Sequence, residues 1–156
     1  MAVEIERRFI VHGDAWRKLA PGVPYRQGYL SVQKERTVRV RIVGSQAWLT
    51  LKGQISDISR HEFEYPIPLA DAQTMMDSMC PMVVDKLRYR IELGGFVWEV
   101  DEFFGENEGL VVAEVELGSE DEAFERPDFL GKEVTGDRRY YNSSLRIRPY
   151  SQWEKE

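Results

Sequence analysis

The sequence predicts a mainly β fold in which eight antiparallel strands close into a barrel around a polar, charged interior, with helices packed against the outside. Two observations lead to this prediction. Charged residues recur at every second position in most of the predicted strands, and side chains of a strand alternate between its two faces with that period. Most of these strands are also joined by short turns, which connect antiparallel neighbours. An even number of such strands can close without free edges.

The first strand is expected at residues 3–11, because Glu4, Glu6 and Arg8 then share one face while apolar side chains occupy the other. The other strands are expected at residues 25–32, 37–42, 47–52, 60–65, 83–93, 97–101 and 111–117.

Three helices are expected between these strands, at residues 15–20, 70–79 and 119–127. Asp14 can cap the first of them, and the last begins with a capping box that starts at Ser119. The end of the chain is ambiguous, since residues from Asp137 onward can also form a helix.

Composition limits the function classes. The 156 residues match one domain, spanning residues 1–156, and 42% hydrophobic content is enough for a core. The net charge of −6 offers no general attraction for nucleic acid or for an anionic membrane. Cys80 is the single cysteine, so no internal disulfide can form, which fits a reducing compartment. Without a leader or a membrane-spanning run, the expected location is the cytoplasm.

The shared charged face can be used in two ways. In a sandwich, the apolar faces meet and the charges face water; in a closed barrel, the charges line a tunnel. Segregation of acidic and basic residues by strand favours the tunnel, as does the prevalence of Arg, whose planar fork suits phosphate oxygens. Clustered carboxylates repel each other, and a hard divalent cation such as Mg²⁺ or Mn²⁺ removes that penalty. A tunnel with one acidic and one basic wall suits a metal-bound polyphosphate.

The segment Glu4-Ile5-Glu6-Arg7-Arg8 resembles the Glu-x-Glu-x-Lys signature of the CYTH, or triphosphate tunnel metalloenzyme, family. Further blocks resemble the family in order, at residues 27–30, 38–41, 49–53, 62–64, 85–89, 99–101, 114–116 and 133–140. One position departs from the signature, because Arg8 replaces its lysine. The charge is kept, but Arg does not release a proton, which excludes proton transfer at this position.

The resemblance implies an eight-stranded antiparallel tunnel that binds triphosphates with Mg²⁺ or Mn²⁺. The compact chain is most similar to small bacterial members that hydrolyse inorganic tripolyphosphate to pyrophosphate and phosphate. The expected metal-binding residues are Glu4, Glu6, Asp101, Glu114 and Glu116, with Glu62, Glu64 and Glu99 nearby. The expected substrate-binding residues are Arg8, Arg39, Arg41, Lys52, Arg60, Lys86 and Arg88. Lys86 is also the best candidate for a catalytic base, although a purely electrostatic role is open.

Several alternatives remain at this point. The same scaffold can serve a class IV adenylate cyclase or a thiamine triphosphatase, and no purine-recognition motif is evident. Because Arg8 departs from the signature, the chain can also be a non-catalytic module that binds polyphosphate or nucleotide. A sandwich with a charged exterior is the simplest alternative. An apolar barrel exterior makes a homodimer plausible.

Overall fold

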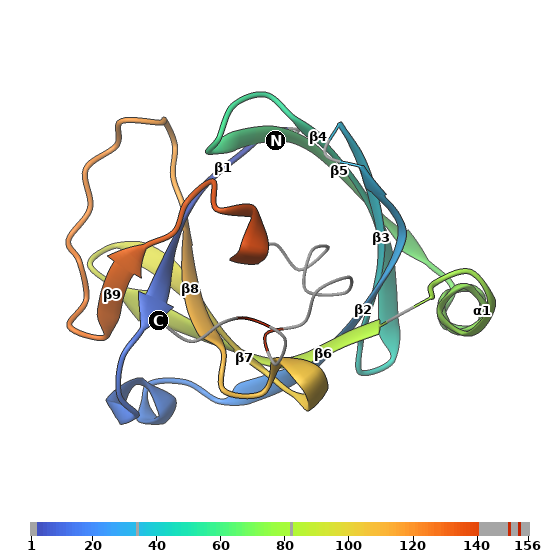
Figure 1. Ribbon diagram of the computed structural model, residues 1–156, viewed down its shortest axis with the longest axis horizontal. Coiled ribbons are helices and arrows are strands. Elements are labelled where there is room, and N and C mark those ends of the chain that lie inside the picture. The colour runs from blue at the N-terminus through green and yellow to red at the C-terminus, as the bar shows by residue number, and fades with distance from the viewer. Residues whose placement is uncertain (1–2, 34, 82, 141–149, 151–152, 154–156) are drawn as a thin grey trace.

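The computed structural model describes residues 3–33, 35–81, 83–140, 150 and 153. Their strands form a ring that encloses an interior space, with one longer helix against the outside (Figure 1). The strands are β1 (Val3–Val11), β2 (Gly22–Gln33), β3 (Arg36–Val43), β4 (Gln46–Gln54), β5 (Ser59–Ile67), β6 (Val83–Leu93), β7 (Phe96–Phe103), β8 (Val111–Glu116) and β9 (Leu130–Glu133). The helices are α1 (Leu69–Ser78) and three short 3-10 helices, η1 (Ala15–Lys18), η2 (Gly105–Asn107) and η3 (Arg138–Tyr140).

The sheet closes on itself. Its strand order is β5-β4-β3-β2-β6-β7-β8-β1-β9, and an additional pairing joins β5 to β1. The pairs are antiparallel throughout, so the predicted eight-stranded antiparallel barrel is confirmed for β1 to β8. The sequence analysis missed β9, which pairs with β1 at Phe9 and Val11.

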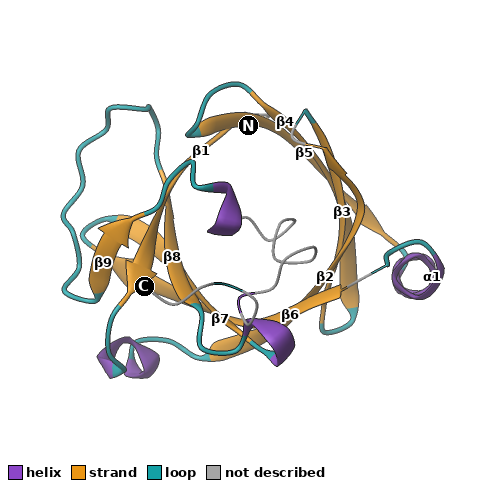
Figure 2. Cartoon of the chain, viewed as in Figure 1, coloured by secondary structure: helices purple, strands orange, loops and turns teal. Residues whose placement is uncertain are grey.

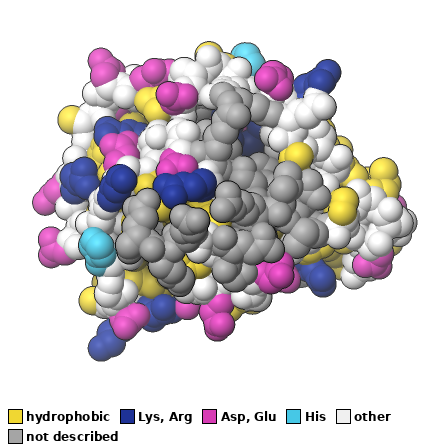
Figure 3. Space-filling view, viewed as in Figure 1, with side chains coloured by type: hydrophobic (Ala, Val, Ile, Leu, Met, Phe, Trp, Pro, Cys, Tyr) yellow, Lys and Arg dark blue, Asp and Glu magenta, His cyan; other side chains and the backbone are white. Residues whose placement is uncertain are grey.

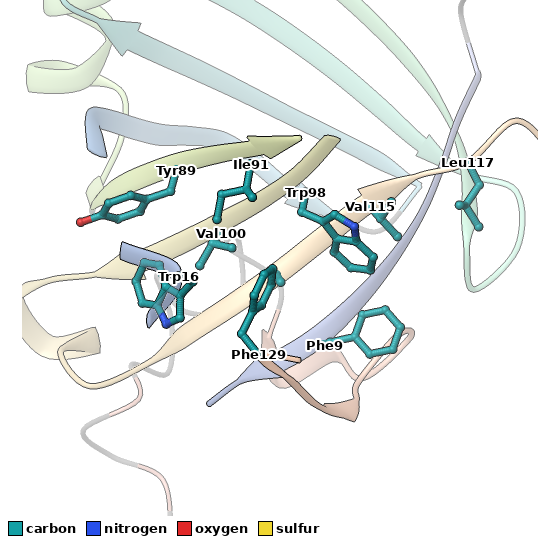
Figure 4. Packing of buried hydrophobic residues seen from close by; sticks show 10 residues of the cluster. Phe9, Trp16, Tyr89, Ile91, Trp98, Val100, Val115, Leu117 and Phe129 are labelled. Carbon is teal, nitrogen blue, oxygen red and sulfur yellow. The ribbon is translucent and has the colours of Figure 1, made fainter. Parts of the chain in front are cut away.

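The barrel has its apolar face outward, and other parts of the chain cover it. Figure 2 shows α1 and the long loop between β8 and β9 outside the ring of strands. The larger outer cluster lies over β1, β6, β7 and β8, where Trp98 packs with Phe9 and Phe129, and Trp16 of η1 packs with Tyr89 (Figure 4). On the opposite side α1 places Ala72 and Met76 against β3 and β4. The sandwich alternative is therefore wrong: the apolar faces do not meet each other across the interior.

Part of the interior is filled by an apolar cluster. Val84, Phe103 and Val112 occupy inward positions near the beginning of β6 and β8 and the end of β7, and Tyr140 of η3 packs on them. Figure 1 shows η3 inside the ring. The rings of Tyr140 and Trp153 meet edge to face, with centroids 5.0 Å apart. The remaining interior is left to charged side chains.

Several predicted elements differ from the structure. The helix expected at residues 119–127 does not form, and this stretch has no regular structure beyond turns. The helix expected at 15–20 is only the 3-10 turn η1, and the Asp14 side chain makes no capping hydrogen bond. β5 runs through Pro66 because β1 pairs with β5 only at residues 59–61, so that edge needs no donor at position 66. Tyr141 and Leu145, expected on one side of a terminal helix, lie outside the described residues.

Acidic and basic side chains are mixed over the face of the molecule seen in Figure 3, with no large patch of one sign. Among the described residues, no helix combines the length and hydropathy that crossing a bilayer requires.

Candidate functional site in the barrel interior

A cavity of about 460 Å³ occupies the charged part of the interior. It is large enough for a small ligand. The predicted site residues that line it are Glu4, Glu6, Arg8, Arg39, Arg41, Lys52, Arg60, Glu62, Glu64, Lys86, Arg88, Glu99, Glu114 and Glu116. They converge because each occupies an inward position of its strand, as the alternation indicated. Asp101 also comes from an inward position, but it is fully buried and does not line the cavity.

One side of the cavity is acidic. Glu4 and Glu6 lie on β1, and Glu6 is directly opposite Glu116 of β8. Burial, together with the charges of Glu114 and Glu4, raises the pKa of Glu6 to about 8. Burial also opposes ionisation of Glu4, but Lys52 and Arg60 lower its pKa to about 2. The acidic side thus holds more carboxylate charge than its local cations neutralise.

The opposite side is basic and is built by β2 and β3. Arg39 lies across from Tyr29, and Arg41 lies across from Gln27. The Nε atom of Arg39 is buried without a hydrogen-bond partner, and no carboxylate among the described residues forms an ion pair with Arg39. Burial and the charges of Arg39 and Arg88 lower the pKa of Arg41 to about 10. Its single carboxylate neighbour in the described chain, Glu64, is 3.9 Å away. This side has unneutralised positive charge.

A buried trio lies between the two sides. Asp101 accepts hydrogen bonds from Lys86 Nζ at 2.7 Å and from Arg88 Nε and Nη2 at 2.8 and 2.9 Å. The two cations therefore share one carboxylate. Burial and the charge of Arg88 lower the pKa of Lys86 to about 7, despite the attraction of Asp101. Lys86 lines the cavity while being only 2% exposed.

Ion pairs connect the acidic residues to the cations around them. Arg60 bonds Glu4 and Glu6 at 3.0 and 2.8 Å. Lys52 lies 3.3 Å from Glu4 and 3.2 Å from Glu62. In the described part of the chain, no three His, Cys, Asp or Glu side chains converge as a preformed metal site. The carboxylates are instead paired with cations, although Glu4 with Glu62 and Glu6 with Glu114 also lie within hydrogen-bonding reach of each other.

Three predicted metal ligands are paired with groups of the basic half of the interior, although Glu99 also lies directly opposite Glu114 in the ladder between β7 and β8. Asp101 is bound within the buried trio, and Glu99 pairs with Arg88 at 3.3 Å. Glu64 accepts a hydrogen bond from Thr50 at 3.2 Å, beside the basic side. The alternation of side chains along each strand predicted that all three point into the interior. It does not predict the stagger between strands, which decides the neighbours of each side chain.

The cavity also contains residues that the sequence analysis did not assign to the site. Arg90 lines it two positions beyond Arg88 on the same strand, and the alternation of β6 was sufficient to find it. Thr37 and Gln54 follow the same parity on β3 and β4. Tyr29 of β2 also lines the cavity. Thr135 and Gly136 carried no such signal, because they follow the unexpected strand β9.

Comparison with known proteins identifies the family. The family model described as the CYTH domain matches residues 2–150. The chain belongs to the CYTH family. This confirms the resemblance of the Glu4–Arg8 segment and of the ordered blocks that follow it.

Curated relatives of this CYTH protein have names that state an activity. The inorganic triphosphatase of Acetivibrio thermocellus is 51% identical over 156 residues, covering 99% of this chain and all of the relative. The inorganic triphosphatase of Nitrosomonas europaea is 36% identical over 148 residues, covering 92% and 97% of the two chains. The crystal structure of the inorganic triphosphatase NE1496 superposes with a TM-score of 0.66 at 35% identity, covering 94% and 96% of the two chains.

Proposed function

We propose that this CYTH protein is a divalent-metal-dependent hydrolase that splits inorganic tripolyphosphate into pyrophosphate and phosphate inside its barrel. The observation that carries the proposal is the division of the cavity into a basic side and an acidic side. On the basic side Arg39 has no carboxylate partner among the described residues, and the acidic side has surplus carboxylates. Relatives named inorganic triphosphatase at up to 51% identity support it.

The basic side would hold the phosphate chain. Arg39 and Arg41 present guanidinium groups that can each donate two hydrogen bonds to phosphate oxygens. Arg88 reaches the cavity next to them and lies 4.9 Å from the Tyr25 ring. Arg8, Lys52 and Arg60 would neutralise charge from the other side, as far as their carboxylate partners allow. Such fixed cations stabilise charge that develops in phosphoryl transfer.

The acidic side fits divalent metal ions. Its donors are all carboxylate oxygens, which hard cations prefer. The pKa of Glu6 is raised first by burial and then by the charges of Glu114 and Glu4, and a further cation would offset both effects. We propose that Glu4, Glu6, Glu114 and Glu116 would hold Mg²⁺ or Mn²⁺, with Glu62 beside them. The bound metal would polarise phosphoryl oxygens and acidify water.

Asp101, Glu64 and Glu99 receive a different role in this proposal. Each is engaged by a cation or a hydroxyl of the basic half of the interior. We propose that they orient those groups and do not bind metal. Asp101 in particular keeps Lys86 and Arg88 fixed where the phosphate chain would lie.

Lys86 is the proposed proton acceptor. In hydrolysis a water oxygen attacks the terminal phosphorus, the anhydride P–O bond breaks, pyrophosphate leaves, and the water loses a proton. A lysine with a pKa of about 7 is partly neutral near neutral pH and can take that proton. Because the neutral form predominates above that pKa, the rate should fall as the pH decreases below about 7. The negative charge of bound phosphate raises the pKa of Lys86, so in the substrate complex the fall in rate begins at a higher pH.

Substitution at Lys86 separates a base from a fixed charge. We expect Lys86→Ala and Lys86→Arg to lower kcat for tripolyphosphate by about 10²-fold or more, the typical contribution of a general base. Both variants should also lose the acidic limb of the pH–rate profile. If Lys86→Arg restores turnover to near the wild-type rate, Lys86 acts only through its charge.

The function is tested by measuring phosphate release from tripolyphosphate, thiamine triphosphate and ATP, each with Mg²⁺, Mn²⁺ or a chelator. We expect tripolyphosphate to be the preferred substrate and the chelator to abolish release. Cyclic AMP formation in excess of phosphate release would establish a cyclase instead. Tight, metal-dependent binding of tripolyphosphate without turnover would establish a binding module.

We also propose that the protein forms a homodimer and that it resides in a reducing compartment such as the cytoplasm. Leu51 of β4 and Phe63 of β5 are paired across the ladder and are exposed, as is Tyr65. An exposed apolar group of this kind is typical of an interface. Cys80 is buried and forms no disulfide. Light scattering after gel filtration would give the mass of the assembly, and a monomer at micromolar concentration would contradict the dimer.

A further inference from the structure

The barrel has a seam along β1. One edge of β1 pairs with β8 over Glu6–Ile10. The other edge pairs with β5 over Val3–Ile5 and then with β9 from Phe9. Between these two ladders, Arg8 is at the change of partner, and its side chain lies in the cavity. We propose that Thr135 is the positioning residue that fixes Arg8 at this seam and thereby the catalytic geometry of the cavity.

The Thr135 hydroxyl replaces a ladder hydrogen bond. The backbone N–H of Arg8 donates to Thr135 Oγ1 at 3.0 Å, and Thr135 Oγ1 donates to Glu133 Oε2 at 2.6 Å. The backbone N–H of Val134 donates to the Arg8 carbonyl at 2.9 Å. Both backbone groups of Arg8 are therefore held by the segment that follows β9. Thr135 Oγ1 also lies 3.4 Å from the Arg8 carbonyl oxygen. Since a hydroxyl has one proton to donate, the shorter contact with Glu133 is its main hydrogen bond and orients it.

The outside of the barrel anchors this contact. Glu133 accepts two hydrogen bonds from Arg7, from Nε at 2.7 Å and from Nη2 at 2.5 Å. Arg7 in turn lies over the ring of Phe124, 5.0 Å from its centroid. Arg7 and Arg8 are on opposite faces of β1, so the chain Arg7–Glu133–Thr135 connects the outer packing to the backbone of an interior residue.

The consequence for catalysis follows from what Arg8 holds. Its Nη2 donates to Glu114 at 2.9 Å and to Glu6 at 3.3 Å. Both carboxylates belong to the acidic side of the cavity. A shift of the β1 backbone at Arg8 would therefore displace a cation and two proposed metal ligands together. A small displacement of reacting groups costs rate more than it costs binding, and the phosphate-binding Arg39 and Arg41 lie on other strands.

The test compares Thr135→Val, which keeps the shape and removes the hydroxyl, with Thr135→Ser, which keeps the hydroxyl. We expect Thr135→Val to lower kcat for tripolyphosphate by about 10-fold to 100-fold with KM within about 2-fold, and Thr135→Ser to stay within about 3-fold of wild type. Thr74→Val is the matched control, because Thr74 is exposed on α1 and its hydroxyl donates to the Ala70 carbonyl of the same helix. It should be unchanged. If Thr135→Val does not fold, Thr135→Ala takes its place with the same expectation.

A double-mutant cycle with Arg8→Met decides whether Thr135 acts through Arg8. We expect Thr135→Val to lower kcat by less than about 2-fold further once Arg8 is absent. A full, additive loss in that background, or a wild-type kcat for Thr135→Val, would overturn the inference.

The inference rests on the proposed function, and the two fail differently. A wild-type protein that releases no phosphate from any triphosphate refutes the proposed function. Turnover by wild type together with an equal rate in Thr135→Val refutes only the role of Thr135.

Discussion

Arg39→Met should lower kcat/KM for tripolyphosphate by about 10²-fold to 10³-fold while leaving the thermal unfolding midpoint unchanged or slightly higher. Truncating a buried partner of a charged hydrogen bond costs about 2–5 kcal/mol, and about 1.4 kcal/mol corresponds to a factor of ten. Arg39 forms no ion pair with a described carboxylate, so its removal leaves no acid without a partner. The substitution also removes the buried Nε atom, which has no acceptor among the described residues. Burying such an unpaired donor is unfavourable for folding, so its removal does not destabilise the protein.

Arg36→Met is the matched control for this variant. Arg36 is on the same strand, is exposed, and hydrogen bonds Gln33 outside the cavity. Its substitution should change neither activity nor stability by more than a small amount. Phosphate release and thermal unfolding measured on both variants separate binding from folding. A wild-type rate in Arg39→Met, or a marked loss of its stability, would contradict the assignment of Arg39 to the substrate.

Asp101→Asn, unlike Arg39→Met, should destabilise the fold. We expect it to lower the free energy of unfolding by about 3–5 kcal/mol, because it leaves two buried cations with no carboxylate between them. Asp101 is fully buried and accepts three hydrogen bonds from Lys86 and Arg88. For a chain of this length the expected fall in the thermal midpoint is about 10 °C.

The exposed Asp77 of α1 provides the control for this change. Asp77→Asn should leave the midpoint within about 2 °C of wild type. If Asp101→Asn were equally mild while metal affinity fell, Asp101 would be a metal ligand after all, as the sequence analysis expected.

The sequence predicted the barrel and its interior residues because one physical rule governs both. Strand alternation fixes which side chains share a face, and it placed residues as distant as Glu4 and Lys86 in one cavity. The same rule does not fix the stagger between strands. For this reason it did not distinguish Glu114, which lines the acidic side, from Asp101, which is enclosed by Lys86 and Arg88.

The failure at residues 119–127 has a local and a tertiary cause. The capping-box groups do form hydrogen bonds, but Glu122 accepts from the backbone of Gly118, and Ser119 bonds Asp121. No helix is needed to satisfy them. The segment instead brings Phe124 against Trp98, with ring centroids 5.6 Å apart. Burial of these rings outweighs the weak helix signal.

The ninth strand was missed because Leu130–Glu133 is short and includes Gly131, with no alternating pattern. It forms because the edge of β1 beyond Ile5 needs hydrogen-bond partners, and a requirement set by a distant strand leaves no trace in the local sequence. Thr135 lies within the block at residues 133–140 that resembles the family, but nothing in that block assigned it to the site.

The near balance of opposite charges in the described interior has a thermodynamic consequence. Carboxylates and cations in the interior already neutralise much of each other's charge, as the ion pairs of Arg60 with Glu4 and Glu6 illustrate. An anion arriving alone would leave carboxylates in excess, and a metal arriving alone would leave arginines in excess. Each ligand should therefore increase the affinity for the other by the same factor, a reciprocity that linkage requires. Calorimetric titration of the metal and the anion, in either order, would measure the coupling free energy between the two binding events.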